Sequence, residues 1–513
     1  MHKFKLDILE DEFWWGGMVQ DGIHMPYKGN NFIRNLSKEQ KNNQSAPLLL
    51  SSKGRYIWSE KPFTYCFDSN ELIVYYETDH INYDEGYENL RGAYLAASQR
   101  YFPPTGKYPD DIMFQVPQYN TWIEMMYEPT QDKVISYAKD IIKNGFPAGV
   151  LIIDDNWQED YGVWDFHPGR FPDPKSMVKT LHDMGFKVML WVCNFISPDS
   201  LTFRELRDLG YLVRETDGKP ALTEWWNGYS ALLDVTNEDA VKWFDKKLET
   251  LKEKFNIDGF KFDAGDIEYF KENYLCSRPC TGNEYSEKWA EIGLKYSFNE
   301  YRACWKMGGQ PLVQRLSDKT HSWKIDTGLG SLIPNGIAQG LLGFSFTCPD
   351  MIGGGEYQSF LEHSQELDQE LIVRSAQCSA LFPMMQFSVA PWRVLSKENL
   401  SYCVAAARLH EELGEEILNL VKAAAINGEP VIRHMEYVFP GNHYENINDQ
   451  FMLGDNILVA PVLQKGATER EIIFPPGVWE DTNGACIQGP GTYLIPAPIN
   501  KLPWYRKKTD KRR

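Results

Sequence analysis

The sequence predicts an α/β protein built on a (β/α)8 TIM barrel, with an N-terminal β-sandwich-like domain and a small C-terminal β-sandwich domain. Three observations lead to this fold. Short apolar runs alternate with helical segments over roughly 330 central residues, a pattern typical of βα units. Both ends of the chain contain short β runs separated by turns. No glycine-rich phosphate-binding turn is found, which argues against a doubly wound sheet.

Changes in this pattern set the predicted domain boundaries. Apolar runs alternate with polar turns up to about residue 110, as expected for antiparallel β structure. Pro103-Pro104-Thr105-Gly106 marks a linker, and short β runs return after Asp449. We predict an N-terminal β domain at residues 1–110, a barrel at 111–447 and a C-terminal β-sandwich domain at 448–513.

The barrel region contains eight candidate strands. They are residues 112–116, 149–153, 187–192, 259–262, 311–313, 341–346, 381–385 and 431–437. Helical periodicity between them is clearest at 131–143 and 239–254. Because the C-terminal ends of barrel strands form the active site in this architecture, the side chains that follow each run are the candidate functional residues.

Composition and charge argue against several classes of partner. The net charge of −18 disfavours nucleic acid and anionic membranes, which attract basic surfaces. No run of about 18 apolar residues predicts a membrane span, and the N-terminus lacks an apolar signal segment. The nine cysteines show no paired spacing, which favours reduced thiols in a cytoplasmic protein. Whether the chain forms a homo-oligomer is left open.

The expected ligand is a small oligosaccharide or glycoside, bound without a cofactor. The chain contains 16 Trp, 27 Tyr and 27 Phe, and aromatic rings of this kind can stack on sugars as well as fill a core. The ten histidines are not spaced as metal ligands, so a metal-dependent hydrolase is disfavoured.

The segment Lys261-Phe262-Asp263-Ala264-Gly265-Asp266 is the strongest functional signal. It ends a predicted buried strand and sets a carboxylate beside a lysine at the end of the barrel that forms active sites. A carboxylate kept ionised by a neighbouring cation suits a nucleophile or an electrostatic stabiliser. The alternative is a surface aspartate beside a solvated lysine.

Other strand ends also carry carboxylates and aromatic residues. The second run ends in Asp154-Asp155-Asn156-Trp157, the third carries Trp191, and a later one ends before Asp350. Acidic residues on different strands suit glycoside hydrolysis, in which one carboxyl group acts as acid and another as nucleophile or base.

Five segments, in order along the chain, resemble glycoside hydrolase family 31. They are Phe171-Pro172-Asp173-Pro174, Trp323-Lys324-Ile325-Asp326, Asp350-Met351-Ile352-Gly353-Gly354, Asp449-Gln450-Phe451-Met452-Leu453-Gly454 with Val459-Ala460-Pro461-Val462, and Phe474-Pro475-Pro476-Gly477-Val478-Trp479. The resemblance covers most of the chain. It implies a retaining, exo-acting α-glycosidase; a catalytically inactive carbohydrate-binding barrel is the alternative from another class.

The resemblance also implies roles for individual residues. Asp263 matches the nucleophile and Asp326 the general acid/base, whose pKa Trp323 and the charge of Asp263 would raise. The further residues expected around the sugar are Asp154, Asp155, Trp157, Trp191, Trp226, Lys261, Arg315, Trp323 and Asp350. Each tryptophan could equally belong to the core, Asp350 to a turn, Asp326 to a cap and Arg315 to a structural ion pair.

Two positions depart from the family pattern, and the second of them bears on specificity. Asp266 stands where many members carry Glu, and Gln386 lies in the stretch where many α-glucosidases place a glucose-binding histidine. The Lys-Phe-Asp-Ala-Gly and Gln-Phe-Ser segments resemble the branch that contains myogenesis-regulating glycosidase and bacterial α-galactosidase-like relatives. The Asp154-Asp155 pair is similar to the galactose-binding pair of classical α-galactosidases. The resemblance therefore favours α-galactosides over α-glucosides, and leaves hydrolysis or transglycosylation open.

Overall fold

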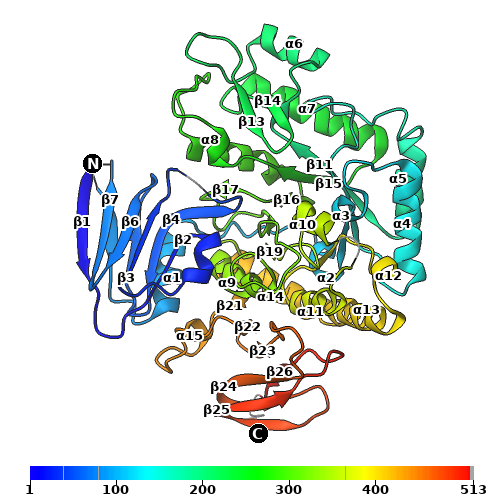
Figure 1. Cartoon of the computed structure of the whole chain (residues 1–513). Helices are drawn as coiled ribbons and strands as arrows, with labels where there is room; N and C mark the ends of the chain where they lie inside the picture. The colour runs from blue at the N-terminus through cyan, green and yellow to red at the C-terminus, as the bar shows by residue number, and fades with distance from the viewer. Residues whose placement is uncertain (39, 79, 364–365, 509–513) are drawn as a thin grey trace.

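The computed structural model describes residues 1–38, 40–78, 80–363 and 366–508. Eight parallel strands at its centre form the predicted barrel, in the order β19-β18-β16-β15-β11-β10-β9-β20 (Figure 1). They are β9 (Gln118–Asn120), β10 (Val150–Ile153), β11 (Lys187–Cys193), β15 (Gly259–Asp263), β16 (Asn299–Tyr301), β18 (Gln314–Arg315), β19 (Thr347–Cys348) and β20 (Gln386–Phe387). Between β19 and β20, which end this order, the Ile352 amide donates to the Gln386 carbonyl at 2.8 Å.

The clearest sequence patterns correspond to the elements that the structure contains. β10, β11 and β15 coincide with predicted runs, and β10 and β15 are fully buried, as strands covered on both faces must be. The predicted helices are α4 (Gln131–Lys143) and α7 (Glu238–Phe255). Thr130 and Asn237 cap their N-termini by accepting backbone amides, which satisfies donors that a helix start leaves free.

Five of the eight predicted strands need correction. Residues 112–116 mainly form the short helix α2 (Ile112–Gln115), and 431–437 contain β21 (Ile432–Arg433) of the C-terminal sheet and α15 (Met435–Val438). The runs 311–313, 341–346 and 381–385 each end just before the observed strands β18, β19 and β20. The apolar runs mark the approach to the barrel, whereas the short strands themselves carry buried polar residues.

Two sheets form the N-terminal domain. One contains β1 (His2–Asp7), β7 (Glu71–Tyr76), β6 (Thr64–Asp68) and β3 (Asn30–Asn35). The other contains β2 (Trp14–Met18), β4 (Gln44–Ser51), β5 (Tyr56–Trp58), β8 (Asn82–Asp84) and β17 (Cys304–Trp305). Because β17 comes from the barrel region and pairs in parallel with β4, it ties this domain to the barrel.

The C-terminal domain, which the sequence predicts to be a small β-sandwich, contains one connected sheet of six strands. Its order is β21-β22-β23-β26-β24-β25, with β22 (Phe451–Leu453), β23 (Ile457–Val459), β24 (Glu469–Glu480), β25 (Cys486–Pro496) and β26 (Trp504–Lys507). A register shift between Phe474 and Gly477 interrupts the long β24–β25 ladder. Phe474, Trp479 and Tyr505 belong to a buried apolar cluster of this domain.

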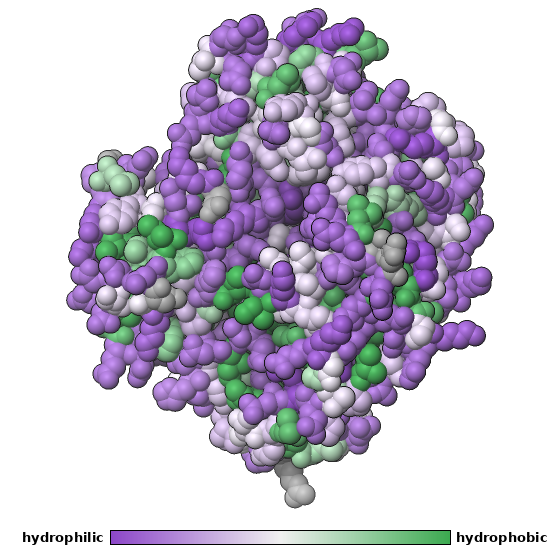
Figure 2. All heavy atoms as spheres, in the orientation of Figure 1, coloured by the Kyte–Doolittle hydropathy of each residue, from purple (hydrophilic) through white to green (hydrophobic). Residues whose placement is uncertain are grey.

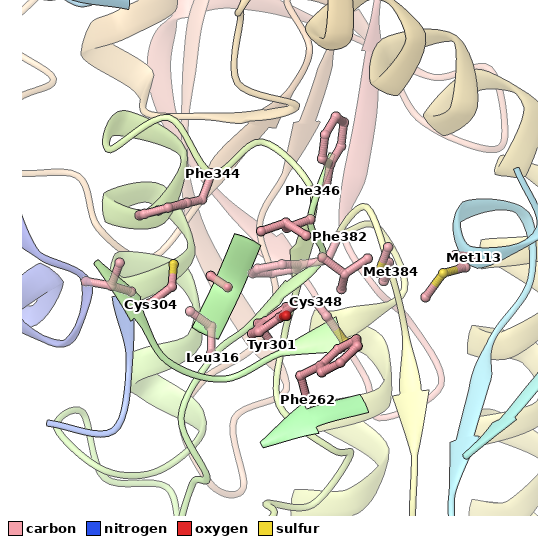
Figure 3. Packing of buried hydrophobic residues seen from close by; sticks show 14 of the residues in the cluster. Met113, Phe262, Tyr301, Cys304, Leu316, Phe344, Phe346, Cys348, Phe382 and Met384 are labelled. Atoms are coloured by element: carbon pink, nitrogen blue, oxygen red, sulfur yellow. The ribbon is translucent and has the colours of Figure 1, made fainter. Parts of the chain in front are cut away.

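A continuous apolar core supports the barrel. Figure 3 shows part of it, including Phe262 of β15 and Tyr301 of β16, whose rings stack with centroids 4.9 Å apart. The face of the molecule in Figure 2 is mostly hydrophilic, with apolar residues in small separate patches. Among the helices of the described residues, none combines the length and apolarity needed to cross a bilayer.

The remaining α-helices belong to the barrel region, except α1, which packs against β4 and β5 of the N-terminal domain. They are α1 (Leu90–Tyr101), α3 (Trp122–Met125), α5 (Pro174–Asp183), α6 (Leu201–Leu209), α8 (Gly282–Ile292), α9 (Leu332–Leu341), α10 (Tyr357–Glu362), α11 (Gln369–Ser379), α12 (Pro391–Val394), α13 (Lys397–Glu412) and α14 (Gly414–Asn427). A small sheet of β12 (Phe195–Ile196), β14 (Gly228–Leu232) and β13 (Leu222–Trp225) lies between β11 and α7, and its β13–β14 turn carries Trp226.

Candidate active site

A cavity of about 270 Å³ lies at the C-terminal ends of the barrel strands. Seven predicted site residues line it: Asp154, Asp155, Trp191, Trp226, Lys261, Asp263 and Arg315. Its other lining residues are Asn42, Trp122, Tyr269, Arg302, Asp318, Met351, Gly355, Glu356, Tyr357 and Gln358. Most of the charged groups around the cavity are thus among the predicted residues, whereas Arg302, Asp318 and Glu356 are not.

Asp263 ends β15 and is held through both carboxylate oxygens. Oδ2 accepts a hydrogen bond from Trp191 Nε1 at 2.8 Å, and Oδ1 accepts one from the Ala264 amide at 2.9 Å. Arg302 Nε lies 3.0 Å from Oδ1. Burial alone would raise the pKa of Asp263, but the positive charges of Arg302, Lys261 and Arg315 outweigh it and lower that pKa well below its usual range. Asp263 is therefore ionised at neutral pH.

Arg302 links Asp263 to Asp266. Its Nη2 lies 2.6 Å from Asp266 Oδ2, so one buried guanidinium pairs with both carboxylates. Burial, together with Glu268 and Asp263, raises the pKa of Asp266, while Arg302 opposes the rise. Asp266, the residue that departs from the family pattern, thus holds the Arg302 guanidinium that faces Asp263.

Two adjacent aspartates after β10 differ in how their oxygens are used. Asp154 Oδ2 accepts from Lys261 Nζ at 2.7 Å and Oδ1 from the Asp155 amide at 2.9 Å. Asp155 Oδ2 accepts from Asn227 at 3.0 Å and from Tyr161 at 3.2 Å, but its buried Oδ1 has no protein partner. Burial and the charge of Asp154 raise the pKa of Asp155 to about 7. Asp155 therefore keeps an acceptor available for a ligand.

Arg315 organises a second group of carboxylates. Its Nη1 lies 2.7 Å from Asp318 Oδ1 and 2.8 Å from Asp350 Oδ1, and its Nε lies 3.3 Å from Glu300 Oε1. Asp350 does not line the cavity; its Oδ2 accepts the amides of Lys319 and Gly355. Burial raises the pKa of Asp350 to about 6. The side chain of Asp318 is 34% exposed, within the cavity wall.

Besides Asp350, three predicted site residues lie outside the cavity. Asp326 is exposed, and its Oδ1 accepts the hydroxyl of the next residue, Thr327. Trp157 is fully buried against Phe166, with Nε1 donating to the Trp191 carbonyl. Trp323 Nε1 donates to Asp368. Trp157 belongs to the core rather than to a sugar platform, because no face of its ring reaches the cavity.

The missed residues sit where sequence patterns are weak. Arg302 follows the polar strand β16 and precedes β17, and neither strand is predicted. Asp318 lies in a loop only three residues after Arg315 and eight before Asp326. The pair Arg315-Asp318 within a strand-end segment is the signal that could have found it.

Among the described residues, no group of three or more His, Cys, Asp or Glu side chains could hold a metal ion.

Comparison with known protein families assigns the chain. The sequence profile described as "Glycosyl hydrolases family 31 TIM-barrel domain" matches residues 112–402, and "Glycosyl hydrolase family 31 C-terminal domain" matches residues 428–509. The chain belongs to glycoside hydrolase family 31. The resemblance noted from five sequence segments is thereby confirmed.

The family 31 relatives differ from this chain in length. Myogenesis-regulating glycosidase of Mus musculus is 33% identical over 410 residues, which cover 78% of this chain and 57% of that protein. Alpha-xylosidase XylQ of Lactiplantibacillus pentosus is 24% identical over 96% of this chain and 67% of its own length. The chain thus spans little more than half the length of the mouse relative.

A solved family 31 structure has the same fold. The Flavobacterium johnsoniae dextranase FjDex31A, complexed with glucose, superposes with a TM-score of 0.86 at 20% identity. The match covers 99% of this chain and 66% of the dextranase.

Proposed function

We propose that this chain is a retaining, exo-acting α-glycosidase that removes terminal non-reducing α-linked sugars through a covalent glycosyl-enzyme intermediate. The observation that carries the proposal is Asp263, a buried carboxylate held ionised at the cavity by Arg302, Lys261 and Arg315. A cavity of about 270 Å³ suits a single sugar unit, which favours action at chain ends. No cofactor is needed for this chemistry.

In the first step, an Asp263 oxygen attacks the anomeric carbon and the glycosidic C–O bond breaks. The leaving oxygen takes a proton from a second carboxyl group. In the second step, water attacks the anomeric carbon, the same group now accepts the water proton, and the Asp263 carboxylate is released. The hydrogen bonds from Trp191 and Ala264 orient the Asp263 oxygens for attack.

We assign the acid/base role to Asp318 in place of Asp326. Asp318 lines the cavity together with Asp263, whereas Asp326 is exposed outside it. A general acid must come within hydrogen-bond reach of the glycosidic oxygen, and position therefore decides between the two. Arg315 orients Asp318 through a 2.7 Å contact.

The proposed substrate class is α-galactosides, with α-glucosides as the alternative. Asp155 offers an unpartnered buried oxygen that suits a sugar hydroxyl, while Asp154 is already bonded to Lys261. Gln386 is held inside the barrel by Gln118 and Glu300 and does not line the cavity. The glucose-binding histidine expected in that stretch thus has no counterpart there, which favours galactose. An inactive carbohydrate-binding barrel remains the alternative outside enzymes.

Initial rates on aryl α-galactoside, α-glucoside, α-xyloside and α-sulfoquinovoside test the proposal. Asp263→Ala and the isosteric Asp263→Asn are the controls. We expect the galactoside to react fastest and both variants to be inactive. A glucoside preference would retain the mechanism and refute the specificity. No turnover of any substrate by the native chain would favour the inactive barrel.

A further inference from the structure

Two of the nine cysteines lie in contact on one surface loop. Cys276 and Cys280 belong to the segment between the 3-10 turn η2 (Ile267–Tyr269) and α8, and their sulfur atoms are 3.8 Å apart. Both side chains are half-buried, and residues 277–279 between them are exposed. Both thiols are free in the structure. The pair therefore combines a sulfur–sulfur contact with access from solvent.

Hydrogen bonds to the backbone hold this loop in place on both sides of the pair. Leu275, directly before the first cysteine, exchanges backbone hydrogen bonds of 2.7 Å and 2.9 Å with Arg214. The Ser277 amide, directly after it, donates to Asp234 Oδ2 at 2.6 Å. Thr281 follows the second cysteine and caps α8 with its side chain. The fold thus brings the two sulfur atoms together, because the chain is anchored around each of them.

Packing against η2 fixes the start of α8 in addition. The rings of Phe270, which follows η2, and Tyr285 of α8 stack with centroids 4.9 Å apart. A Cβ atom built on Gly282 would lie 2.9 Å from the Ile267 carbonyl oxygen, so the first turn of α8 lies directly against η2. The second cysteine, two residues before this glycine, therefore has little freedom to move away from the first.

This contact suits a disulfide better than a metal site. A disulfide bond is about 2 Å long, so an approach of the two sulfur atoms by roughly 2 Å closes it. The described residues add no third Cys, His, Asp or Glu that would complete a metal site around the pair. Buried thiols such as Cys193 and Cys403 lack both a sulfur partner within reach and access for a reagent.

The two thiols differ in their readiness to react. The hydrogen bond with Cys280, followed by burial, raises the pKa of Cys276, so Cys276 keeps its proton. The thiolate is the form that attacks a disulfide. The first attack therefore falls to Cys280.

We propose that Cys276 and Cys280 form a reversible thiol–disulfide site, which low-molecular-weight disulfides oxidise and low-molecular-weight thiols reduce. This inference goes beyond the proposed glycosidase activity and does not depend on it, because neither cysteine lines the cavity. It assigns a modification site to the loop that connects the barrel strand β15 to α8.

The oxidation proceeds in two exchange steps. The Cys280 thiolate attacks one sulfur of the small disulfide, whose S–S bond breaks and releases the first small thiolate. Cys276 then loses its proton to solvent and attacks the Cys280 sulfur, which releases the second small thiolate. The protein has lost two electrons and two protons, and the small disulfide has gained them as two thiols.

Peptide mapping of the folded native chain tests the site. Trypsin cuts after Lys271 and Lys288 but not at the Arg278–Pro279 bond, so the peptide 272–288 contains this pair and no other cysteine. The protein is incubated with oxidised glutathione, and the remaining thiols are blocked with iodoacetamide. We expect this peptide to be about 2 Da lighter than its reduced form and to carry no blocking group. Treatment with dithiothreitol should restore both thiols.

Variants of single cysteines supply the controls. Cys276→Ser removes the thiol that completes the bond, so Cys280 should retain one glutathione, an increase of about 305 Da. Cys486→Ser removes an exposed thiol of the C-terminal domain and should leave the linked peptide unchanged. The same titration in urea measures what the fold contributes. We expect the folded chain to close the bond at a ratio of oxidised to reduced glutathione at least about threefold lower than the unfolded chain.

Three results would overturn the proposal. One is a native peptide 272–288 with both thiols blocked or glutathionylated at a glutathione concentration that modifies Cys486. Another is an unmodified Cys280 in the Cys276→Ser variant, because the first exchange step would then have no nucleophile. The last is closure at the same glutathione ratio in the folded and unfolded chains, which would show that the fold does not build the contact.

Discussion

Arg302 and Asp263 form the ion pair that sets the charge of the cavity. Their Nε and Oδ1 atoms lie 3.0 Å apart, and both side chains are nearly inaccessible to solvent. The guanidinium also contacts Asp266 at 2.6 Å and lies 4.8 Å from the centre of the Trp226 ring. The Arg302 guanidinium is thus fixed by two carboxylates and by the face of an aromatic ring. Because packing fixes the Arg302 guanidinium, it stays beside Asp263 and stabilises the ionised form of that carboxylate.

Arg302→Gln should shift the acidic limb of the pH–rate profile upward. Asp263 must be ionised to act, and its pKa is held low by Arg302 first and then by Lys261 and Arg315. Loss of the first cation raises that pKa, so activity disappears at a higher pH as the solution is acidified. We expect the acidic limb to move upward by about one to three pH units, so that the loss of kcat/KM relative to the native enzyme is largest at the most acidic pH at which the native enzyme still works. Arg278→Gln, which removes an exposed partner of Glu238, is the control. An unmoved acidic limb would contradict the role.

Asp318→Asn and Asp326→Asn should behave differently. Asp318 lines the cavity and Asp326 is exposed outside it. We expect the first change to lower kcat/KM for a disaccharide by about 10³-fold or more, and the second to change it less than about twofold. Azide, an anion that can replace water as nucleophile, should accelerate turnover of an activated aryl glycoside by Asp318→Ala. Equal losses of kcat/KM in both asparagine variants would contradict the assignment of Asp318 as the acid/base.

Sequence patterns predicted the parts of the barrel whose strands are mainly apolar. β10, β11 and β15 are buried on both faces, so their hydrophobic runs coincide with the strands and place Asp154 and Asp263 correctly at the ends. β16, by contrast, reads Asn299-Glu300-Tyr301, and its polar side chains are buried inside the barrel. A strand of this composition has no hydrophobic signature, and Arg302, the residue after it, was missed for the same reason.

Short spacing cannot tell which residue of a loop reaches the cavity, and Asp318 reaches it whereas the predicted Asp326 does not. Asp318 and Asp326 lie in one loop. Asp318 follows Arg315 by three residues and Asp326 follows Trp323 by three, so either spacing could mark a functional carboxylate. Tertiary contacts set the path of the loop. Arg315 donates a hydrogen bond to Asp318, and the Lys319 amide donates one to Asp350. Trp157 shows the same limit, since a tryptophan at a strand end can pack inward as readily as face a ligand.

Asp155→Asn should stabilise the fold at alkaline pH while lowering activity. Burial raises the pKa of Asp155 to about 7 in the folded state, whereas the unfolded chain releases this proton near pH ~4. Stability is therefore lost as pH rises between these values, because the unfolded state ionises first. We expect the free energy of unfolding at pH 8 to rise by about 1–3 kcal/mol in the variant, with a smaller gain at pH 5.

Urea unfolding at both pH values measures this difference, with the exposed Asp208→Asn as control. Activity should fall because the amide no longer offers the carboxylate oxygen that a sugar hydroxyl would donate to. A destabilised variant at pH 8 would show that the Asp155 charge is fully compensated in the native protein.

Gly355→Ala should damage catalysis more than stability. A Cβ atom at this position would lie 2.6 Å from Asp350 Oδ1 and 3.0 Å from Asp318 Oδ1, so the methyl group must displace the two carboxylates that Arg315 holds. The residue is not in the left-handed region, so the backbone itself accepts alanine.

We expect kcat/KM to fall by about 10²-fold or more, because a shift of the general acid by a fraction of an ångström spoils its alignment. Gly169→Ala, an exposed position whose Cβ atom would approach only the half-buried His167 side chain, is the matched control. Thermal unfolding should shift by only a few degrees in both variants (about 1 kcal/mol). If Gly355→Ala retained full activity, Asp318 could tolerate displacement, and its assignment as the precisely placed acid would fail.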